Sequence, residues 1–100
     1  MQRGEVYEYL PVLARPGQSR MRLIVSGQSI NDAEHPVVLG LQVLERDPGG
    51  LLSVRIGELG WAPVLTIEAV LRRRLGSLIA TATDEEMEAI STILRVAQDL

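Results

Sequence analysis

Hydrophobic and polar side chains alternate along most of the first eighty residues, which is the period of strands with one face in a core. In residues 4–10, Val6 points one way and Tyr7 and Tyr9 point the other, so this segment is predicted to be a half-buried strand. Two prolines and a glycine follow in residues 11–19 and predict a flexible loop.

Residues 20–26 are predicted to form the next strand, with two chemically different faces. One face carries Met21, Leu23 and Val25, and the other carries Arg20, Arg22, Ile24 and Ser26. We expect the first face to lie in the core. The two arginines of the second face are either solvated strand residues or ligands for a phosphate group, and the alternation alone favours solvated residues.

A buried strand and a hairpin are predicted in the middle of the chain. Residues 35–46 are predicted to form a buried strand, with Val37, Leu39, Leu41 and Val43 facing inward. The sequence Asp-Pro-Gly-Gly at 47–50 is a turn signal, so residues 51–56 are expected to pair with that strand. The expected inward residues of the returning strand are Leu52, Val54 and Ile56. A loop should follow from Gly57 to Pro63.

Residues 64–80 form a long apolar run whose composition fits a strand better than a helix. Glycine weakens a strand and often marks a bend, so an interruption is expected near Gly76. Arg72, Arg73 and Arg74 would then alternate between the two faces of a strand. A solvated face is the simpler interpretation of these three arginines, and a nucleic-acid contact is the alternative.

The last segment is predicted to be a helix over residues 84–98. Thr83 and Glu86 have the spacing of a capping box, and Asp84, Glu85 and Glu86 lie in the first turn, where the helix dipole favours acids. One stripe of the helix carries Met87, Ile90, Leu94 and Ala97, widened by Ile93.

These elements predict an α+β fold that is mainly β: a small, strongly curved antiparallel sheet with one C-terminal helix. The chain has 100 residues, which is enough for one core, so we expect a single domain over residues 1–100 with its strands within residues 4–80. Phe is absent and the aromatic content is 3%, so the core must be aliphatic. Without cysteine or a long apolar run, the chain offers no disulfide and no membrane span, and a cytoplasmic protein is expected.

The charge distribution argues against simple electrostatic binding of nucleic acid. The net charge is −3, whereas nucleic-acid-binding domains usually carry a basic face. Residues 84–100 hold five acids against one arginine, a net charge of −4, which leaves residues 1–83 with nine arginines, eight acids and a net charge of +1. All ten basic residues are arginine, which suits bidentate contacts to phosphate but also follows from a GC-rich genome.

The usual catalytic motifs are absent from the sequence. One histidine and no cysteine leave no metal site of the usual kind, and no cofactor is expected. His35 is the one side chain that titrates near neutral pH unaided, but an exposed loop histidine is the simpler interpretation. Trp61 lies in a glycine-flanked loop, where a core plug or an oligomer contact is favoured over stacking on a base.

Five segments, in their order and spacing, nevertheless match one known family. They are Arg3-Gly4-Glu5-Val6-Tyr7, Arg22-Leu23-Ile24-Val25-Ser26 followed by Asn31, Pro36 to Leu44, Arg73-Arg74-Leu75-Gly76, and Thr83-Asp84-Glu85-Glu86-Met87. Over nearly its full length the chain resembles the MazF/PemK branch of the MazF and CcdB superfamily, the small toxins of bacterial type II toxin–antitoxin pairs.

The resemblance implies a homodimer of SH3-like barrels, a cognate antitoxin and cleavage of single-stranded RNA. In such endoribonucleases, or mRNA interferases, the ribose 2′-hydroxyl attacks the adjacent phosphate and leaves a 2′,3′-cyclic phosphate. The resemblance places the catalytic arginine at Arg22. Arginine is a poor acid or base because its pKa is above 12, but its planar fork suits a pentacoordinate phosphate, so charge stabilisation is the expected role.

The chain departs from the family pattern near the expected site. The family has a small hydroxyl residue at the end of a strand where this chain has Gly40-Leu41-Gln42-Val43, so Gln42 is the candidate to replace it as a second catalytic residue. The candidate RNA-binding residues are Gln18, Arg20, Ser26 and Thr66. Thr66-Ile67-Glu68 stands where the family often has a Gln-Ile-Arg triplet that contacts RNA, so an acid replaces a base, and Glu68 is expected to repel phosphate.

A non-enzymatic member of the superfamily is the alternative. It would be either a CcdB-like gyrase inhibitor or a binding protein whose activity has decayed. Gyrase inhibition in that branch depends on a C-terminal ending with an aromatic residue and a glycine, whereas this chain ends Gln98-Asp99-Leu100. Gyrase is therefore the lower-ranked partner.

Overall fold

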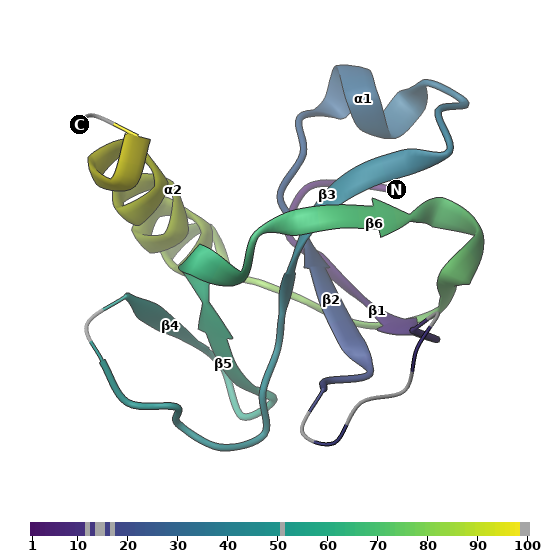
Figure 1. The fold of residues 1–100 in the computed structure, drawn as a ribbon. Helices are drawn as coiled ribbons and strands as arrows, with labels where there is room; N and C mark the ends of the chain where they lie inside the picture. The colour runs from purple at the N-terminus through teal and green to yellow at the C-terminus, as the bar shows by residue number, and fades with distance from the viewer. Residues whose placement is uncertain (12, 14–15, 17, 51, 99–100) are drawn as a thin grey trace.

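The computed structural model describes the whole chain except residues 12, 14–15, 17, 51 and 99–100. A five-stranded antiparallel sheet has the strand order β6-β3-β2-β1-β7 (Figure 1). Its strands are β1 (Glu5–Tyr9), β2 (Met21–Ile24), β3 (Val37–Gln42), β6 (Glu68–Leu71) and β7 (Leu75–Thr81). The predicted mainly antiparallel fold is confirmed, and within the described residues the sheet is not closed into a barrel.

The remaining elements flank this sheet. A second sheet consists of β4 (Ser53–Ile56) and β5 (Gly60–Pro63), and the helices are α1 (Gln28–Asp32) and α2 (Asp84–Gln98). Two short 3-10 helices, η1 (Val64–Thr66) and η2 (Arg72–Arg74), lie on either side of β6. In the part of the chain that the structure describes, no helix is long and apolar enough to cross a membrane.

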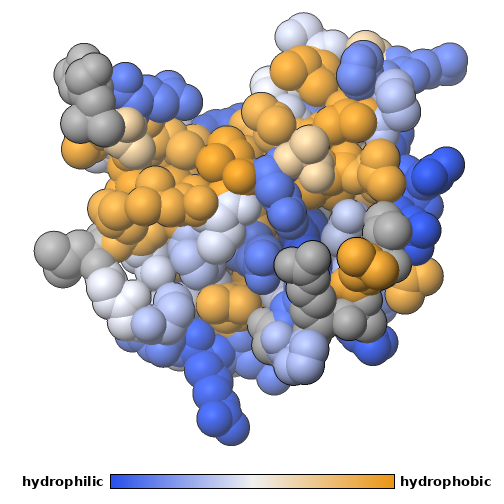
Figure 2. Space-filling view, viewed as in Figure 1, coloured by the Kyte–Doolittle hydropathy of each residue, from blue (hydrophilic) through white to orange (hydrophobic). Residues whose placement is uncertain are grey.

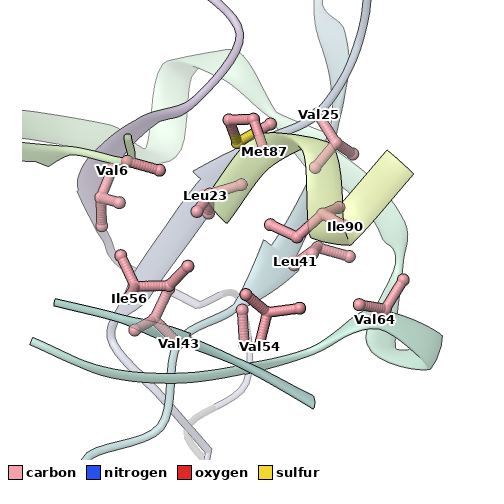
Figure 3. Close-up of a cluster of buried hydrophobic side chains, with 12 residues drawn as sticks. Val6, Leu23, Val25, Leu41, Val43, Val54, Ile56, Val64, Met87 and Ile90 are labelled. Carbon is pink, nitrogen blue, oxygen red and sulfur yellow. The ribbon is translucent and has the colours of Figure 1, made fainter. Parts of the chain in front are cut away.

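The main core lies between the five-stranded sheet, the β4–β5 hairpin and α2 (Figure 3). It is aliphatic, as the composition predicts, and its labelled members are Val6, Leu23, Val25, Leu41, Val43, Val54, Ile56, Val64, Met87 and Ile90. The predicted core face of β2 and the predicted apolar stripe of α2 both contribute to it. Burial of these side chains is the dominant favourable term in folding.

The opposite face of β2 is also buried, which the alternation pattern did not predict. Ile24 is fully buried in a second cluster with Val38 and Val70, and Tyr7 and Tyr9 pack against it. β2 is the central strand of the sheet, so neighbouring strands and a second apolar cluster cover both of its faces. The prediction of a solvated face carrying Arg22 and Ile24 is therefore wrong.

The buried residues of β3 also differ from the prediction, because apolar clusters lie on both faces of the sheet. Leu41 and Val43 are buried as predicted, but Leu39 is 38% exposed, while Val38 is buried in the second cluster. A strand between two clusters presents apolar residues to both sides, so a single inward face does not describe it.

The predicted hairpin has a different partner. β4 pairs with β5, with Ser53 opposite Pro63 and Ile56 opposite Gly60, so residues 52–56 do not return along β3, and residue 51 of the predicted strand lies outside the described residues. The reversal is a tight turn at residues 57–59, where the Leu59 amide donates to the Ile56 carbonyl at 2.9 Å and Gly57 adopts φ +50°. Part of the expected 57–63 loop is thus a strand, and Leu52 is 41% exposed rather than inward.

The run over residues 64–80 is mostly strand, as predicted, but it is interrupted at different places. Val64–Thr66 and Arg72–Arg74 form η1 and η2, and β7 continues through Gly76. The three arginines therefore lie on a 3-10 helix and do not alternate on a strand. This kink is what allows β6 to pair with β3 and β7 to pair with β1 on opposite edges of the sheet.

Arg72 connects this kink to the short helix α1, which the sequence did not predict. Its Nε donates to the His35 carbonyl at 2.8 Å and its Nη1 to the Asn31 carbonyl at 3.0 Å. Its Nη2 donates to the carbonyls of Ile30 and Ala33 at 3.2 and 3.0 Å. One guanidinium thus binds three carbonyl groups at the end of α1, which a helix end leaves without partners, and the His35 carbonyl beyond the helix.

Replacing Arg72 with lysine is expected to lower the free energy of unfolding by about 2 kcal/mol, because one ammonium group cannot replace a fork that binds four carbonyls. The midpoint of urea unfolding measures the change. Arg73→Lys is the matched control, since Arg73 is the exposed neighbour of Arg72. Equal midpoints for the two variants would contradict this role of Arg72.

The start of α2 is the predicted capping box, with one additional bond. The Glu86 amide donates to the Thr83 hydroxyl oxygen at 3.1 Å, and the Thr83 amide donates to Glu86 Oε1 at 2.8 Å. Glu86 Oε2 also accepts from the Gly57 amide at 2.6 Å, so the same carboxylate joins α2 to the β4–β5 turn.

Thr83→Ala is expected to cost about 1 kcal/mol of stability, the usual effect of losing a helix cap. Glu86→Ala is expected to cost about 2 kcal/mol, because it removes two hydrogen bonds to a charged acceptor. Thermal unfolding monitored by circular dichroism measures both changes. Glu85→Ala serves as the control because it removes an exposed acid from the same turn; a loss as large as that of Glu86→Ala would assign the effect to the helix dipole.

Candidate active site

Arg22 lies at the centre of the five-stranded sheet. It is opposite Tyr7 on β1 and opposite Gln42 on β3, and its side chain is 0% exposed. A fully buried arginine is rare because removing the charge from water is costly unless the guanidinium is paired and hydrogen-bonded. The contacts of Arg22 therefore define the candidate site.

Four interactions hold the Arg22 guanidinium. Its Nε donates to Glu68 Oε1 at 2.7 Å, which forms an ion pair. Its Nη1 donates to the carbonyls of Ser19 and Met21 at 2.7 and 2.8 Å. The Tyr9 ring lies 4.4 Å from the guanidinium carbon, within the range of a cation–π contact.

The second terminal nitrogen of Arg22 is different. Nη2 is buried and has no hydrogen-bond partner among the residues that the structure describes. Buried polar groups are nearly always paired, so an unpaired one in a polar cluster points to a ligand, a water or a functional role. A phosphate oxygen is an acceptor that fits this donor.

The register of the sheet explains why Arg22 and Glu68 meet. Arg22 is opposite Gln42, and Glu68 is opposite Gly40 two residues away on β3, so the four positions share one face. Gly40 has no side chain to separate the two charged groups. A Cβ added there would lie 3.0 Å from Val70 and 3.7 Å from the Arg22 Cβ.

Gln42 and Thr66 lie at the same end of β3. The backbone amide of Gln42 donates to the Thr66 hydroxyl oxygen at 3.2 Å, and the Thr66 hydroxyl donates to the Pro63 carbonyl at 2.6 Å. The structure thus brings together Arg22, Gln42, Thr66 and Glu68. A hydroxyl group, supplied by Thr66, lies next to the strand position where the family pattern has one.

An open groove of about 670 Å³ lies beside this cluster. It is lined by Gln18, Ser19, Arg20 and Met21 on one side and by residues 43–48 on the other. Arg20 is exposed, whereas the Gln18 side-chain oxygen is buried with no hydrogen-bond partner among the described residues. The predicted loop before this segment includes residues 12, 14–15 and 17, which lie outside the described residues.

Comparison with solved structures identifies the fold. An endoribonuclease from mycobacterial species aligns with 100% of this chain and 92% of its own, at 25% identity and a TM-score of 0.80. A mycobacterial endoribonuclease in complex with its cognate antitoxin aligns with 100% of this chain and 96% of its own, at 23% identity and a TM-score of 0.83. MazF from Deinococcus radiodurans aligns with 99% of this chain and 96% of its own, at 17% identity and a TM-score of 0.78. The chain has a MazF-type toxin fold.

Among these comparisons, only structural similarity identified the MazF-type fold. No protein-family profile matches the sequence, and no curated protein sequence matches it. The predicted resemblance to MazF is thereby confirmed in the fold, over the full length of the chain.

Ser26 lies away from the cluster, although it was a candidate RNA-binding residue. It is 2% exposed, its hydroxyl donates to Asn31 Oδ1 at 2.6 Å, and its carbonyl accepts from Asn31 Nδ2 at 2.9 Å. These bonds fasten α1 to the end of β2 in the MazF-type fold. The structure therefore gives Ser26 an architectural environment rather than a place beside Arg22.

Two other singled-out residues also lie outside the cluster. His35 is exposed, and its Nδ1 accepts from the Val37 amide at 3.3 Å. Trp61 exchanges two backbone hydrogen bonds with Leu44, and Arg55 lies over its ring at 5.4 Å. No group of three or more potential metal ligands occurs among the described residues.

Tyr9 and the pairing role of Glu68 were not found from the sequence. Tyr9 carried only the signal of a half-buried strand, and Glu68 was interpreted as a source of repulsion. The ion pair joins residues 46 positions apart, and no local pattern encodes which distant acid a buried arginine meets.

Tyr7 lies opposite Arg22 but is not available as a base. Burial raises the pKa of Tyr7 to about 12, and its hydroxyl donates to Glu5 Oε1 at 2.8 Å, which favours the protonated form further. Near neutral pH Tyr7 is therefore a neutral hydrogen-bond donor.

Proposed function

We propose that this protein is the toxin of a type II toxin–antitoxin pair and an endoribonuclease that cleaves single-stranded RNA. The observation that carries the proposal is the full-length structural match, at 25% identity, to a mycobacterial endoribonuclease. In the reaction the 2′-hydroxyl attacks the adjacent phosphate, and the products are a 2′,3′-cyclic phosphate and a 5′-hydroxyl end. The function belongs to one domain over residues 1–100.

Arg22 is the proposed stabiliser of the negative charge that develops on the phosphate. Its Nη2 is an unpaired donor within the described structure, fixed in direction by the bonds of Nε and Nη1. Donors that are oriented in advance and shielded from water stabilise developing charge more strongly than donors in solution. Reaching Nη2 requires a movement of the side chains that cover it, because Arg22 is 0% exposed.

Gln42 is the proposed second catalytic residue, in place of the family's hydroxyl residue, and Thr66, Gln18 and Arg20 are the proposed contacts to the rest of the RNA. Gln42 and Thr66 lie at the end of β3 near Arg22, and their side chains offer neutral donors and acceptors. Gln18 and Arg20 line the groove next to it, and Arg20 is exposed there. We leave Ser26 out of this set because its hydroxyl and carbonyl are both bound to Asn31.

The proposed partners are a cognate antitoxin and a second copy of this chain. One of the matching structures is a complex of an endoribonuclease with its cognate antitoxin. Large apolar side chains are exposed on this protein, among them Leu65 at 61% and Leu78 at 52%. Apolar surface gathers near α2 and near β3 and β6 on one face (Figure 2), which is typical of a surface that binds another protein. A cytoplasmic location fits a substrate that is cellular RNA.

The gyrase alternative is not favoured. The matching structures are endoribonucleases or MazF, alone or with an antitoxin. Growth arrest with gyrase–DNA adducts and intact RNA would support gyrase inhibition over RNA cleavage.

The test is incubation of the purified protein with a long single-stranded RNA, followed by mapping of the cut sites and their end chemistry. We expect discrete cuts with 2′,3′-cyclic phosphate ends. The matched substrate control carries a 2′-deoxynucleotide at one mapped site, and cleavage should vanish at that site alone. RNA left intact by the folded protein would refute the proposed function.

A further inference from the structure

Transfer of the 2′-hydroxyl proton needs a base, and the described groups around Arg22 are the first candidates. An arginine side chain is a poor base because its guanidinium group holds its proton tightly, and Tyr7 is protonated near neutral pH because its pKa is raised to about 12. His35 lies at the other end of β3 from Gln42, roughly 20 Å away for a strand of this length. Glu68 is the acid that contacts Arg22.

The two oxygens of Glu68 lie in different environments. Oε1 accepts from the buried Arg22 Nε at 2.7 Å, and the Glu68 side chain is 39% exposed while that of Arg22 is 0% exposed. Within the described part of the chain, Oε2 makes no hydrogen bond. The carboxylate therefore links a buried cation to a surface that RNA can reach.

We propose that Glu68 is the general base of the cleavage reaction, accepting the 2′-hydroxyl proton while Arg22 binds the scissile phosphate. This inference rests on the proposed function. The proton moves from the 2′-oxygen to Glu68 as the bond between that oxygen and phosphorus forms. The bond from phosphorus to the 5′-oxygen then breaks, the leaving 5′-oxygen takes a proton from water, and the Glu68 carboxyl group returns its proton to the hydroxide that is left.

The ion pair between Glu68 and Arg22 couples proton transfer to the stabilisation of charge on the phosphate. Before the reaction the negative charge of Glu68 offsets the positive charge of Arg22, which explains how the buried guanidinium is tolerated. Proton transfer neutralises Glu68 at the moment when negative charge develops on the phosphate. The Arg22 charge is then no longer offset, so it acts most strongly in the transition state, where stabilisation raises the rate.

Among the described residues, one charged group is shown in contact with Glu68. Arg22 from β2 is the charged group in contact with it, and Tyr9 from β1 lies on the guanidinium of Arg22. The facing positions on β3 are Gly40 and Gln42, and Thr66 precedes it on η1; none of these three titrates.

The experiment compares wild type with E68Q, which keeps an oxygen acceptor for Arg22 Nε but removes the base. Single-turnover cleavage by E68Q is expected to be at least about 100-fold slower, the usual lower effect of losing a general base. Wild-type cleavage should fall on acidification, because a protonated carboxyl group cannot accept the proton, and E68Q should show no such fall. Affinity for an RNA with a 2′-deoxynucleotide at the cut site should stay within threefold or become tighter.

Two further variants distinguish a general-base role of Glu68 from other roles of its side chain. E68D retains a carboxylate and should keep the acid-side fall at a reduced rate. E85Q removes an exposed acid of α2 that does not line the groove and does not contact Arg22, and should cut within threefold of wild type.

Each outcome decides the question. Cleavage by E68Q equal to or faster than wild type would overturn the proposal and assign Glu68 to repulsion of phosphate. A slow E68Q that keeps the acid-side fall would also overturn it, because Glu68 would then only position Arg22. Wild-type protein that leaves RNA intact would refute the proposed function and this role with it, whereas cutting by both proteins would refute this role alone.

Discussion

Replacing Arg22 with alanine is expected to reduce RNA cleavage about 1000-fold, which is the loss measured when an enzyme is deprived of a buried donor to a developing oxyanion. The substitution removes the cation that pairs with Glu68 among the described residues. It also leaves that carboxylate unpaired beside the expected phosphate position, where it would repel the substrate. Single-turnover cleavage at saturating RNA measures the chemical step.

The same substitution should destabilise the fold, so stability has to be measured together with activity. Arg22 is fully buried, and removing one partner of such a pair is strongly destabilising. Arg22→Lys keeps the charge but lacks the planar fork that binds Glu68, Ser19 and Met21 at once. We expect Arg22→Lys to be closer to wild type in stability and still at least about 100-fold slower in cleavage.

Arg20→Ala is the matched control for these variants. Arg20 belongs to the same segment but is exposed and lines the groove, so its loss should weaken RNA binding and leave the chemical step within about tenfold. Cleavage by a folded Arg22→Ala protein at the rate of Arg20→Ala would refute the assignment of charge stabilisation to Arg22.

Sequence patterns correctly predicted those features of the fold that depend on interactions between residues close together in the sequence. The capping box at Thr83 and Glu86, the apolar stripe of α2 and the core face of β2 all follow from residues within a few positions of one another. Hydrophobic periodicity and helix caps are properties of single elements, so a sequence contains them in full.

The errors concern which elements meet. A turn signal at residues 47–50 predicted pairing with β3, but β4 pairs with β5 because the tighter turn at residues 57–59 brings them together. Alternation predicted a solvated Arg22, but its exposure depends on β2 being the central strand and on a glutamate 46 positions away. Only the resemblance to MazF indicated that Arg22 belonged to a site, and it did so without the ion pair.

A second large effect is expected at Gly60, where β5 begins beside the end of β3. Gly60 adopts φ +155°, a conformation that residues with a side chain rarely adopt. A Cβ at this position would overlap the carbonyl oxygen of Leu44 and lie 2.9 Å from its carbonyl carbon. Both are backbone atoms, so no side-chain rotation can relieve the overlap.

Leu44 cannot move away without breaking a connection that the core requires. Its amide donates to the Trp61 carbonyl at 2.7 Å, and its carbonyl accepts from the Trp61 amide at 2.8 Å. These two bonds hold the β4–β5 hairpin against β3, and the hairpin supplies Val54, Ile56 and Ala62 to the main core (Figure 3). Displacing it exposes apolar surface and breaks paired backbone groups at once.

Gly60→Ala is therefore expected to lower the free energy of unfolding by at least about 3 kcal/mol, a value reserved for a few mechanisms such as this overlap. For a domain of this size the change corresponds to a fall in Tm of about 12 °C or more, measured by circular dichroism. Gly49→Ala is the control, because Gly49 also has a positive φ, +77°, but an added Cβ there meets no atom within 4 Å. Backbone strain alone should cost Gly49→Ala about 1 to 2 kcal/mol. If Gly60→Ala unfolds at the temperature of Gly49→Ala, then the contact between Gly60 and Leu44 does not hold the hairpin, and the two hydrogen bonds to Trp61 do not determine its position.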